Sequence, residues 1–226
     1  MRTWKIIVFS LLPALSLAQS GPISQVNPEG APVSFITRNI DYADIKANGS
    51  QYFDEEFAYG EVFSKDSVVL RAEMRFNAFR NEIQVLQQGD ESYPLLKRSY
   101  IMAKIGAKRF NIYIYEDARG NNRSSYFNPL NEGNAVLLYK PEIKLKQGRI
   151  PATSYDRTVP PTYIDISAYY IRKGDGIAKR IRLKKIDILE VLEDKKSEIQ
   201  AYIKGDNLSV RKEADLIKIM DYYNSL

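Results

Sequence analysis

The sequence predicts an α+β fold, in which an antiparallel β meander forms a sheet-rich body and two or three short C-terminal helices follow it. Two observations support this prediction. Between about residues 59 and 182, short runs of alternating apolar and polar residues are separated by turn residues, which is typical of half-buried antiparallel strands. After residue 184 the apolar residues recur at helical spacing. Strands and helices in separate parts of a chain indicate the α+β class.

The composition of the 226-residue chain excludes several kinds of chemistry. There is no Cys, so disulfides, thiolate metal sites and cysteine nucleophiles are excluded. There is no His, so a Ser-His-Asp triad and imidazole metal ligands are excluded as well. Apolar residues make up 44% of the chain, which is enough for the core of one ordinary domain.

Residues 1–18 have the pattern of a secretory signal peptide. A short basic start with Arg2 and Lys5 precedes an apolar run over residues 6–17, and Ala18 offers a cleavage site. The run is shorter than the roughly 20 residues of a membrane span, and no later segment reaches that length. A buried N-terminal helix is the alternative. We expect cleavage after Ala18 and no transmembrane segment in the mature chain.

Cleavage would also change the charge of the protein. Loss of Arg2 and Lys5 leaves 31 basic residues against 28 acidic ones, a net charge of +3. So small an excess argues against a nucleic-acid partner, because nucleic-acid-binding proteins concentrate much more positive charge on one face.

The mature chain begins with a leader over residues 19–48, whose proline and glycine content opposes regular structure. The β-rich body follows over residues 49–183. Its clearest strand is Val68–Phe76, where every second residue is apolar. Pro141 should end or kink the strand before it, and residues 148–161 should form a loop.

The hairpin signal at Gly174–Gly176 is the strongest in the chain. It should join two strands, over Tyr163–Arg172 and Ile177–Leu183. The helical segment then covers residues 184–226 and packs on the body. Its clearest helix, Lys212–Tyr223, has Leu216, Ile217, Met220 and Tyr223 on one face.

A resemblance can be named from the C-terminal part of the chain. The stretches Asp187–Leu189, Lys195–Lys196, Asp215–Lys218 and Asp221–Leu226 resemble the tail of a family of uncharacterised exported bacterial proteins. The Tyr-rich strands and the Gly174–Gly176 hairpin are similar to that family too. The resemblance implies a bacterial envelope origin, a Tyr-rich β body and a short helical tail, and it implies no activity.

A basic run supplies the candidate binding residues: Arg172, Lys179, Arg180, Arg182 and Lys184. If the strand continues through this run, Arg180, Arg182 and Lys184 point to one side of it. Such a row suits phosphates, lipid headgroups or an acidic protein surface. The alternative is an ordinary solvated face whose charges are balanced by nearby Glu190, Glu193 and Asp194.

Three other groups of residues are weaker candidates for a site. Asp54, Glu55 and Glu56 could supply one carboxylate of a glycosidase pair if Glu116 or Asp117 supplied the other. Residues 117–122 offer oxygens for calcium, but their spacing favours a plain β-turn. Tyrosines at 113, 115, 126, 155, 163, 169 and 170 could stack on sugars, but core or edge packing is favoured.

These observations predict an exported, soluble bacterial envelope protein, periplasmic or secreted, that is non-enzymatic and works by binding. Its expected partners are an envelope protein, a polymer or an anionic surface, without a cofactor or metal and without nucleic acid. The alternative is a carboxylate-based hydrolase that acts on an extracytoplasmic polymer such as a glycan. It would require two facing carboxylates in a cleft.

Overall fold

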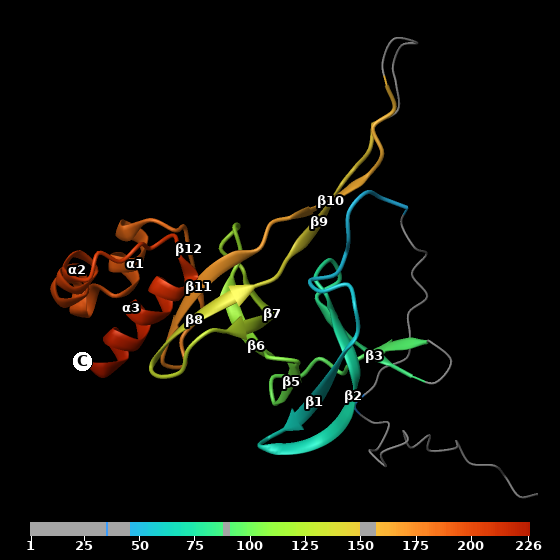
Figure 1. The fold of residues 1–226 in the computed structure, drawn as a ribbon, viewed down its shortest axis with the longest axis horizontal. Helices are drawn as coiled ribbons and strands as arrows, with labels where there is room; N and C mark the ends of the chain where they lie inside the picture. Colours follow the sequence, from blue (N-terminus) through green and yellow to red (C-terminus); the bar gives the residue numbers. More distant parts are fainter. Residues whose placement is uncertain (1–34, 36–45, 88–90, 150–156) are drawn as a thin grey trace, which may run out of the picture.

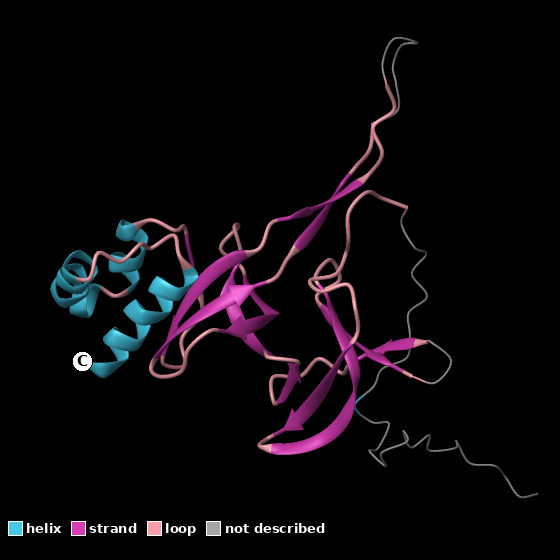
Figure 2. Cartoon of the chain, in the orientation of Figure 1, coloured by secondary structure: helices cyan, strands magenta, loops and turns pink. Residues whose placement is uncertain are grey.

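The computed structural model describes residue 35 and residues 46–87, 91–149 and 157–226 (Figure 1). The predicted signal peptide and most of the predicted leader lie outside these residues. The described chain confirms the α+β class, because a strand-rich body comes first and the helices gather at the C-terminal end (Figure 2). No described helix has both the length and the apolar character that a membrane span requires.

Ten of the described strands form one sheet in which every pairing is antiparallel. The strands of this sheet are β1 (Ala58–Ser64), β2 (Ser67–Asn77), β3 (Glu82–Leu86), β4 (Ser92–Pro94), β5 (Ile101–Ile105), β6 (Lys108–Glu116), β7 (Asn122–Pro129), β8 (Ala135–Lys140), β11 (Ala168–Lys173) and β12 (Lys179–Ile181). Their spatial order is β12-β11-β8-β7-β6-β5-β1-β2-β3-β4. The order departs from a simple meander at one place, because β5 pairs with β1 and not with β4.

Strand β6 carries apolar side chains on both faces and joins the two halves of the sheet. Phe110 and Ile112 point into a core of residues from β1, β2, β3 and β5, here called the sheet core. Tyr113 and Tyr115 alternate with them and therefore point to the opposite face. There they pack in a second cluster, the tyrosine core, whose buried members are Tyr115, Phe127, Leu138, Tyr170 and Ala178.

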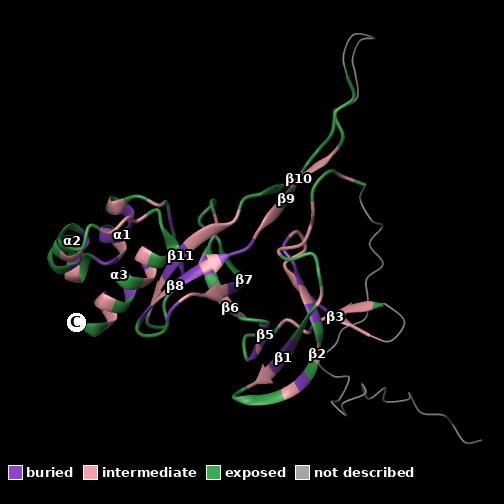
Figure 3. Ribbon diagram, in the orientation of Figure 1, coloured by how far each residue is buried: buried purple, intermediate pink, exposed green. Residues whose placement is uncertain are grey.

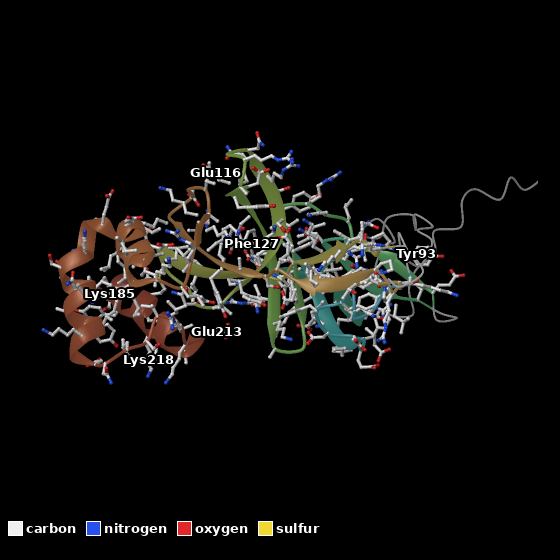
Figure 4. All side chains as sticks on the ribbon, turned by 90° about the horizontal axis from the view of Figure 1, so that it is seen from above. Tyr93, Glu116, Phe127, Lys185, Glu213 and Lys218 are labelled. Carbon is white, nitrogen blue, oxygen red and sulfur yellow. The ribbon has the colours of Figure 1, made fainter. Side chains whose placement is uncertain are left out.

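The C-terminal half of the sheet curls until its edge strand meets β6. The amide of Ala178 donates to the carbonyl of Ile114 over 2.9 Å, and Tyr115 and Ala178 form a parallel bridge just before β12. The tyrosine core fills the space that this curl encloses. Figure 4 places Phe127 near the middle of the molecule, between the helices at one end and Tyr93 of β4 at the other.

Three α-helices cover the outer face of β8, β11 and β12 (Figure 1). They are α1 (Lys185–Val191), α2 (Lys196–Gly205) and α3 (Glu213–Ser225), with a short 3-10 helix at Glu193–Lys195. Their apolar side chains and those of the strands form the helix core. The predicted stripe on the last helix is largely confirmed, but Ile219 is fully buried where Ile217 was expected. Residues 216, 219, 220 and 223 follow the helical period more closely.

Asn224 fastens the end of α3 to the sheet. Its side-chain oxygen accepts a hydrogen bond from the amide of Ala135 over 2.8 Å. Its side-chain nitrogen donates to the carbonyl oxygens of Ala135 and Glu132 over 2.9 and 3.0 Å. Gly133 allows this approach, because a Cβ there would overlap the Asn224 side chain and its φ of +123° suits glycine.

A two-stranded ribbon of β9 (Ile143–Lys146) and β10 (Thr162–Asp165) projects from the body (Figure 1). It continues the β8–β11 hairpin outward. Pro141 ends β8, as predicted. The predicted loop over residues 148–161 contains no strand among its described residues, but Arg149 and Val159 form an isolated antiparallel bridge in it with two backbone hydrogen bonds. This bridge keeps the register in which Lys146 faces Thr162.

Candidate anion-binding surfaces

The predicted basic strand is shorter than the sequence suggested, and it does not align the basic residues on one face. β12 ends at Ile181, so Arg182 and Lys184 lie outside it. Within β12, Arg180 stands opposite Tyr170 and Lys179 stands opposite Ile171. Because Tyr170 belongs to the tyrosine core and Ile171 to the helix core, Arg180 and Lys179 point to opposite faces of the sheet.

Two of the predicted binding residues are engaged by acids of their own chain. Arg172 donates to Asp175 over 2.8 Å and to the carbonyl of Gly176 over 3.2 Å. The Arg182 side chain donates two hydrogen bonds, of 2.7 and 2.9 Å, to the carboxylate of Asp187. Arg182 thereby holds the pKa of the Asp187 carboxyl below its usual value. These two arginines serve the fold, because Arg172 supports the β11–β12 hairpin and Arg182 supports the start of α1.

The other three, Lys179, Arg180 and Lys184, are exposed, and no ion pair joins them to any described residue. We call these three residues the strand cations. Glu190, Glu193 and Asp194 were expected to balance the charges of the basic run. Of these three acids, Asp194 forms an ion pair with a described residue of that run. Asp194 pairs with Lys173 and accepts a hydrogen bond from the hydroxyl of Tyr223.

The acidic candidates have structural partners as well. Asp54 pairs with Lys108, whose Nζ lies 2.6 Å from Oδ2. Asp117 accepts hydrogen bonds from the amides of Arg119 and Asn121 and from Arg123, which confirms a turn between β6 and β7. Arg123 and these amides lower the pKa of Asp117. Among the described residues, no group of three or more acidic side chains gathers in a way that could hold a metal ion.

Most of the candidate tyrosines pack in the interior or at its edge, as the favoured interpretation predicted. Tyr115, Tyr126 and Tyr170 are buried, and Tyr113 and Tyr169 are half-buried. Tyr115 and Tyr170 meet edge to face, with ring centroids 5.6 Å apart. Tyr155 lies outside the described residues.

The described part of the ribbon carries more unpaired positive charge than the strand cations do. Lys144, Lys146, Arg149 and Arg157 are all exposed, and no ion pair joins them to a described residue. Residues 143–149 contain no acid, and residues 157–166 contain one, Asp165. We call these four basic residues the ribbon cations. Figure 3 shows the ribbon exposed along most of its length beyond the body.

The cross-strand register places exposed aliphatic side chains beside two of the ribbon cations. Lys144 stands opposite Ile164, which is 37% exposed, and Arg149 stands opposite Val159, which is 44% exposed. The constant register puts the first pair on one face of the ribbon and the second pair on the other. Both faces of the ribbon therefore combine positive charge with exposed apolar surface.

Contacts with the body fix the direction in which the ribbon leaves it. The ring of Tyr163 packs against Phe79 with centroids 5.3 Å apart. Asn48 forms a bridge with Thr162 and exchanges hydrogen bonds of 2.8 Å with the backbone of Pro161 and Tyr163. On the other strand, the amide of Ile143 donates to the carbonyl of Ala78 over 3.2 Å. The ribbon cations are thus held away from the body before any partner arrives.

Lys140 anchors the root of the ribbon from inside the sheet. Its side chain is only 3% exposed, and it donates to the hydroxyl of Tyr115 over 3.0 Å and to Glu142 over 2.7 Å. Burial alone would lower the pKa of Lys140, but these two hydrogen bonds outweigh it and raise that pKa. Ser167 completes the root, because its hydroxyl accepts from the amide of Glu142.

The ribbon was not predicted from the sequence, because the prolines before its second strand are more typical of a loop than of a strand. Pro160 and Pro161 indicated a loop, and they lie directly before β10, whose ribbon is not paired with the larger sheet. Gly148 makes the pairing possible, since a Cβ there would come within 3.0 Å of the Pro160 carbonyl carbon. The alternation of apolar and basic residues in Ile143–Lys146 is the signal that could have revealed it.

No family model, curated protein or solved structure matches this chain. The resemblance to exported bacterial proteins therefore stays a prediction about origin. Its coarser content, a sheet-rich body followed by a few C-terminal helices, is present in the fold.

Proposed function

We propose that this protein is a non-enzymatic binding protein of the bacterial envelope, and that it contacts an anionic partner through the ribbon cations. The observation that carries the proposal is the projecting ribbon, in which four exposed basic side chains, none with an ion pair to a described residue, are held away from the body. Exposed like charges close together raise the local potential and attract anionic surfaces. The signal-peptide pattern of residues 1–18 supports a location outside the cytoplasm.

A pull-down tests this proposal. The chain from Gln19 to Leu226 is mixed with bacterial envelope fragments prepared without detergent, at low and at physiological salt. A variant with Lys144, Lys146 and Arg149 changed to Gln removes three charges from the ribbon. The matched control changes Lys179, Arg180 and Lys184 to Gln and removes the same number from the predicted strand site.

We expect capture of envelope material that is retained at physiological salt, lost with the ribbon variant and kept with the control. Loss with the control variant alone would move the binding site to the strand cations and overturn the assignment to the ribbon. Equal capture by all three proteins would show that neither cationic surface is the site. Circular dichroism confirms that each variant is folded before it is used.

A further inference from the structure

We infer that the partner of the ribbon is the surface of an anionic phospholipid bilayer, an inference that rests on the proposed function and names its partner class. Charge alone does not separate a lipid surface from a dissolved polyanion, because both attract cations. The side chains that accompany each cation on the described residues of the ribbon make the distinction.

The cross-strand pairs supply this distinction. In Lys144–Ile164 and in Arg149–Val159, a basic side chain stands directly opposite an exposed aliphatic one. The Cβ atoms of such directly opposed residues are about 5 Å apart. The two pairs lie on opposite faces of the ribbon, so a bilayer surface meets one pair at a time. The long basic side chain of that pair can reach the phosphate layer while its short aliphatic partner enters the boundary with the acyl chains. A dissolved polyanion would use the cations and gain little from the aliphatic side chains.

The shape and anchoring of the ribbon agree with this partner. A membrane surface is broad and flat, so a protein that touches it needs a projecting element that the body does not obstruct. The ribbon projects from the body in Figure 1, and the Tyr163–Phe79 contact and the Asn48 bridge hold its base. Because these contacts exist in the protein alone, little conformational entropy is lost when the ribbon binds.

Vesicle co-sedimentation tests the inference with the chain from Gln19 to Leu226, because the apolar residues 6–17 would themselves enter a bilayer. The probes are vesicles of phosphatidylglycerol mixed with phosphatidylcholine, vesicles of phosphatidylcholine alone, and soluble polyphosphate. Besides the ribbon and strand variants described above, a fourth protein carries Val159→Ser and Ile164→Ser. Both changes are at exposed positions, so the fold should be kept.

We expect binding to the phosphatidylglycerol vesicles and none to phosphatidylcholine alone. The ribbon variant should bind about a hundredfold more weakly, as expected for three basic residues near an anionic membrane. The aliphatic variant should bind the vesicles about tenfold more weakly and should bind polyphosphate as the parent does. The strand variant should resemble the parent protein.

Two results would overturn the inference in different ways. If polyphosphate binds in a ribbon-dependent manner while vesicles do not, or if the aliphatic variant binds vesicles as well as the parent, the lipid assignment fails and the proposed function stands. If no probe binds in a ribbon-dependent manner and the pull-down from envelope fragments is also unaffected by the ribbon variant, the proposed function fails too. Ribbon-dependent capture of envelope fragments without vesicle binding assigns the ribbon to a protein or polymer partner.

Discussion

Lys140 shows how a single buried charge can fix the geometry of a distant surface. Its ammonium group lies over the ring of Tyr115 at 4.3 Å and is hydrogen-bonded to that residue and to Glu142. Glu142 in turn accepts, through its backbone carbonyl, the amide of Ile166 on the returning strand. Lys140 therefore links the tyrosine core to both strands at the root of the ribbon.

Replacing Lys140 with Met should lower the free energy of unfolding by about 2 kcal/mol, because the buried hydroxyl of Tyr115 loses its donor. Urea unfolding followed by circular dichroism measures this. Lys144→Met, at an exposed position of the ribbon, is the matched control and should change stability by less than about 0.5 kcal/mol. Equal effects of the two substitutions would contradict the anchoring role of Lys140.

At the scale of elements, β8 depends on the helices because both of its faces are buried. Ala135 and Leu137 face the helix core, and Leu138 faces the tyrosine core. Ile219 of α3 lies in the helix core and is fully buried. Ile219→Ala should therefore cost about 3 kcal/mol of stability, from lost burial and the cavity left behind.

Lys218, the residue before it, provides the comparison for this prediction. Its side chain is 61% exposed, and its nearest acid, Asp215, lies 3.9 Å away. Lys218→Ala should shift the urea midpoint only slightly. A comparable loss in both variants would mean that α3 is not packed on β8 as described.

The elements that the sequence predicted well are those with local signals. The alternation in Val68–Phe76 and the Gly174–Gly176 hairpin needed only neighbouring residues, and both are present. Pairings between distant segments have no such signal, so the insertion of β1 between β5 and β2 was not predicted. The site was harder to predict. The strand ends at Ile181, and Arg182 beyond it pairs with Asp187. The alternation of apolar and polar residues gives no indication of that contact.

For the molecule as a whole, the two halves of the sheet should unfold together. β6 and β7 supply Phe110 and Tyr126 to the sheet core, and Tyr115 and Phe127 to the tyrosine core. Because the halves share these strands, neither can lose its packing without exposing the other. We expect a single cooperative transition in which the midpoints from backbone and tyrosine circular dichroism coincide. Two separated midpoints would show that the halves are independent units.

The attachment of Asn224 to Ala135 also has a consequence for timing. The two residues are 89 positions apart, so β8 is synthesised well before the helix that covers its outer face. At roughly 5–20 residues per second, that delay is on the order of ten seconds. During this interval the apolar residues of β8 that the helices later cover remain exposed and accessible to chaperones. If the chain is exported as proposed, the same delay would keep it unfolded long enough to be threaded through a translocation channel.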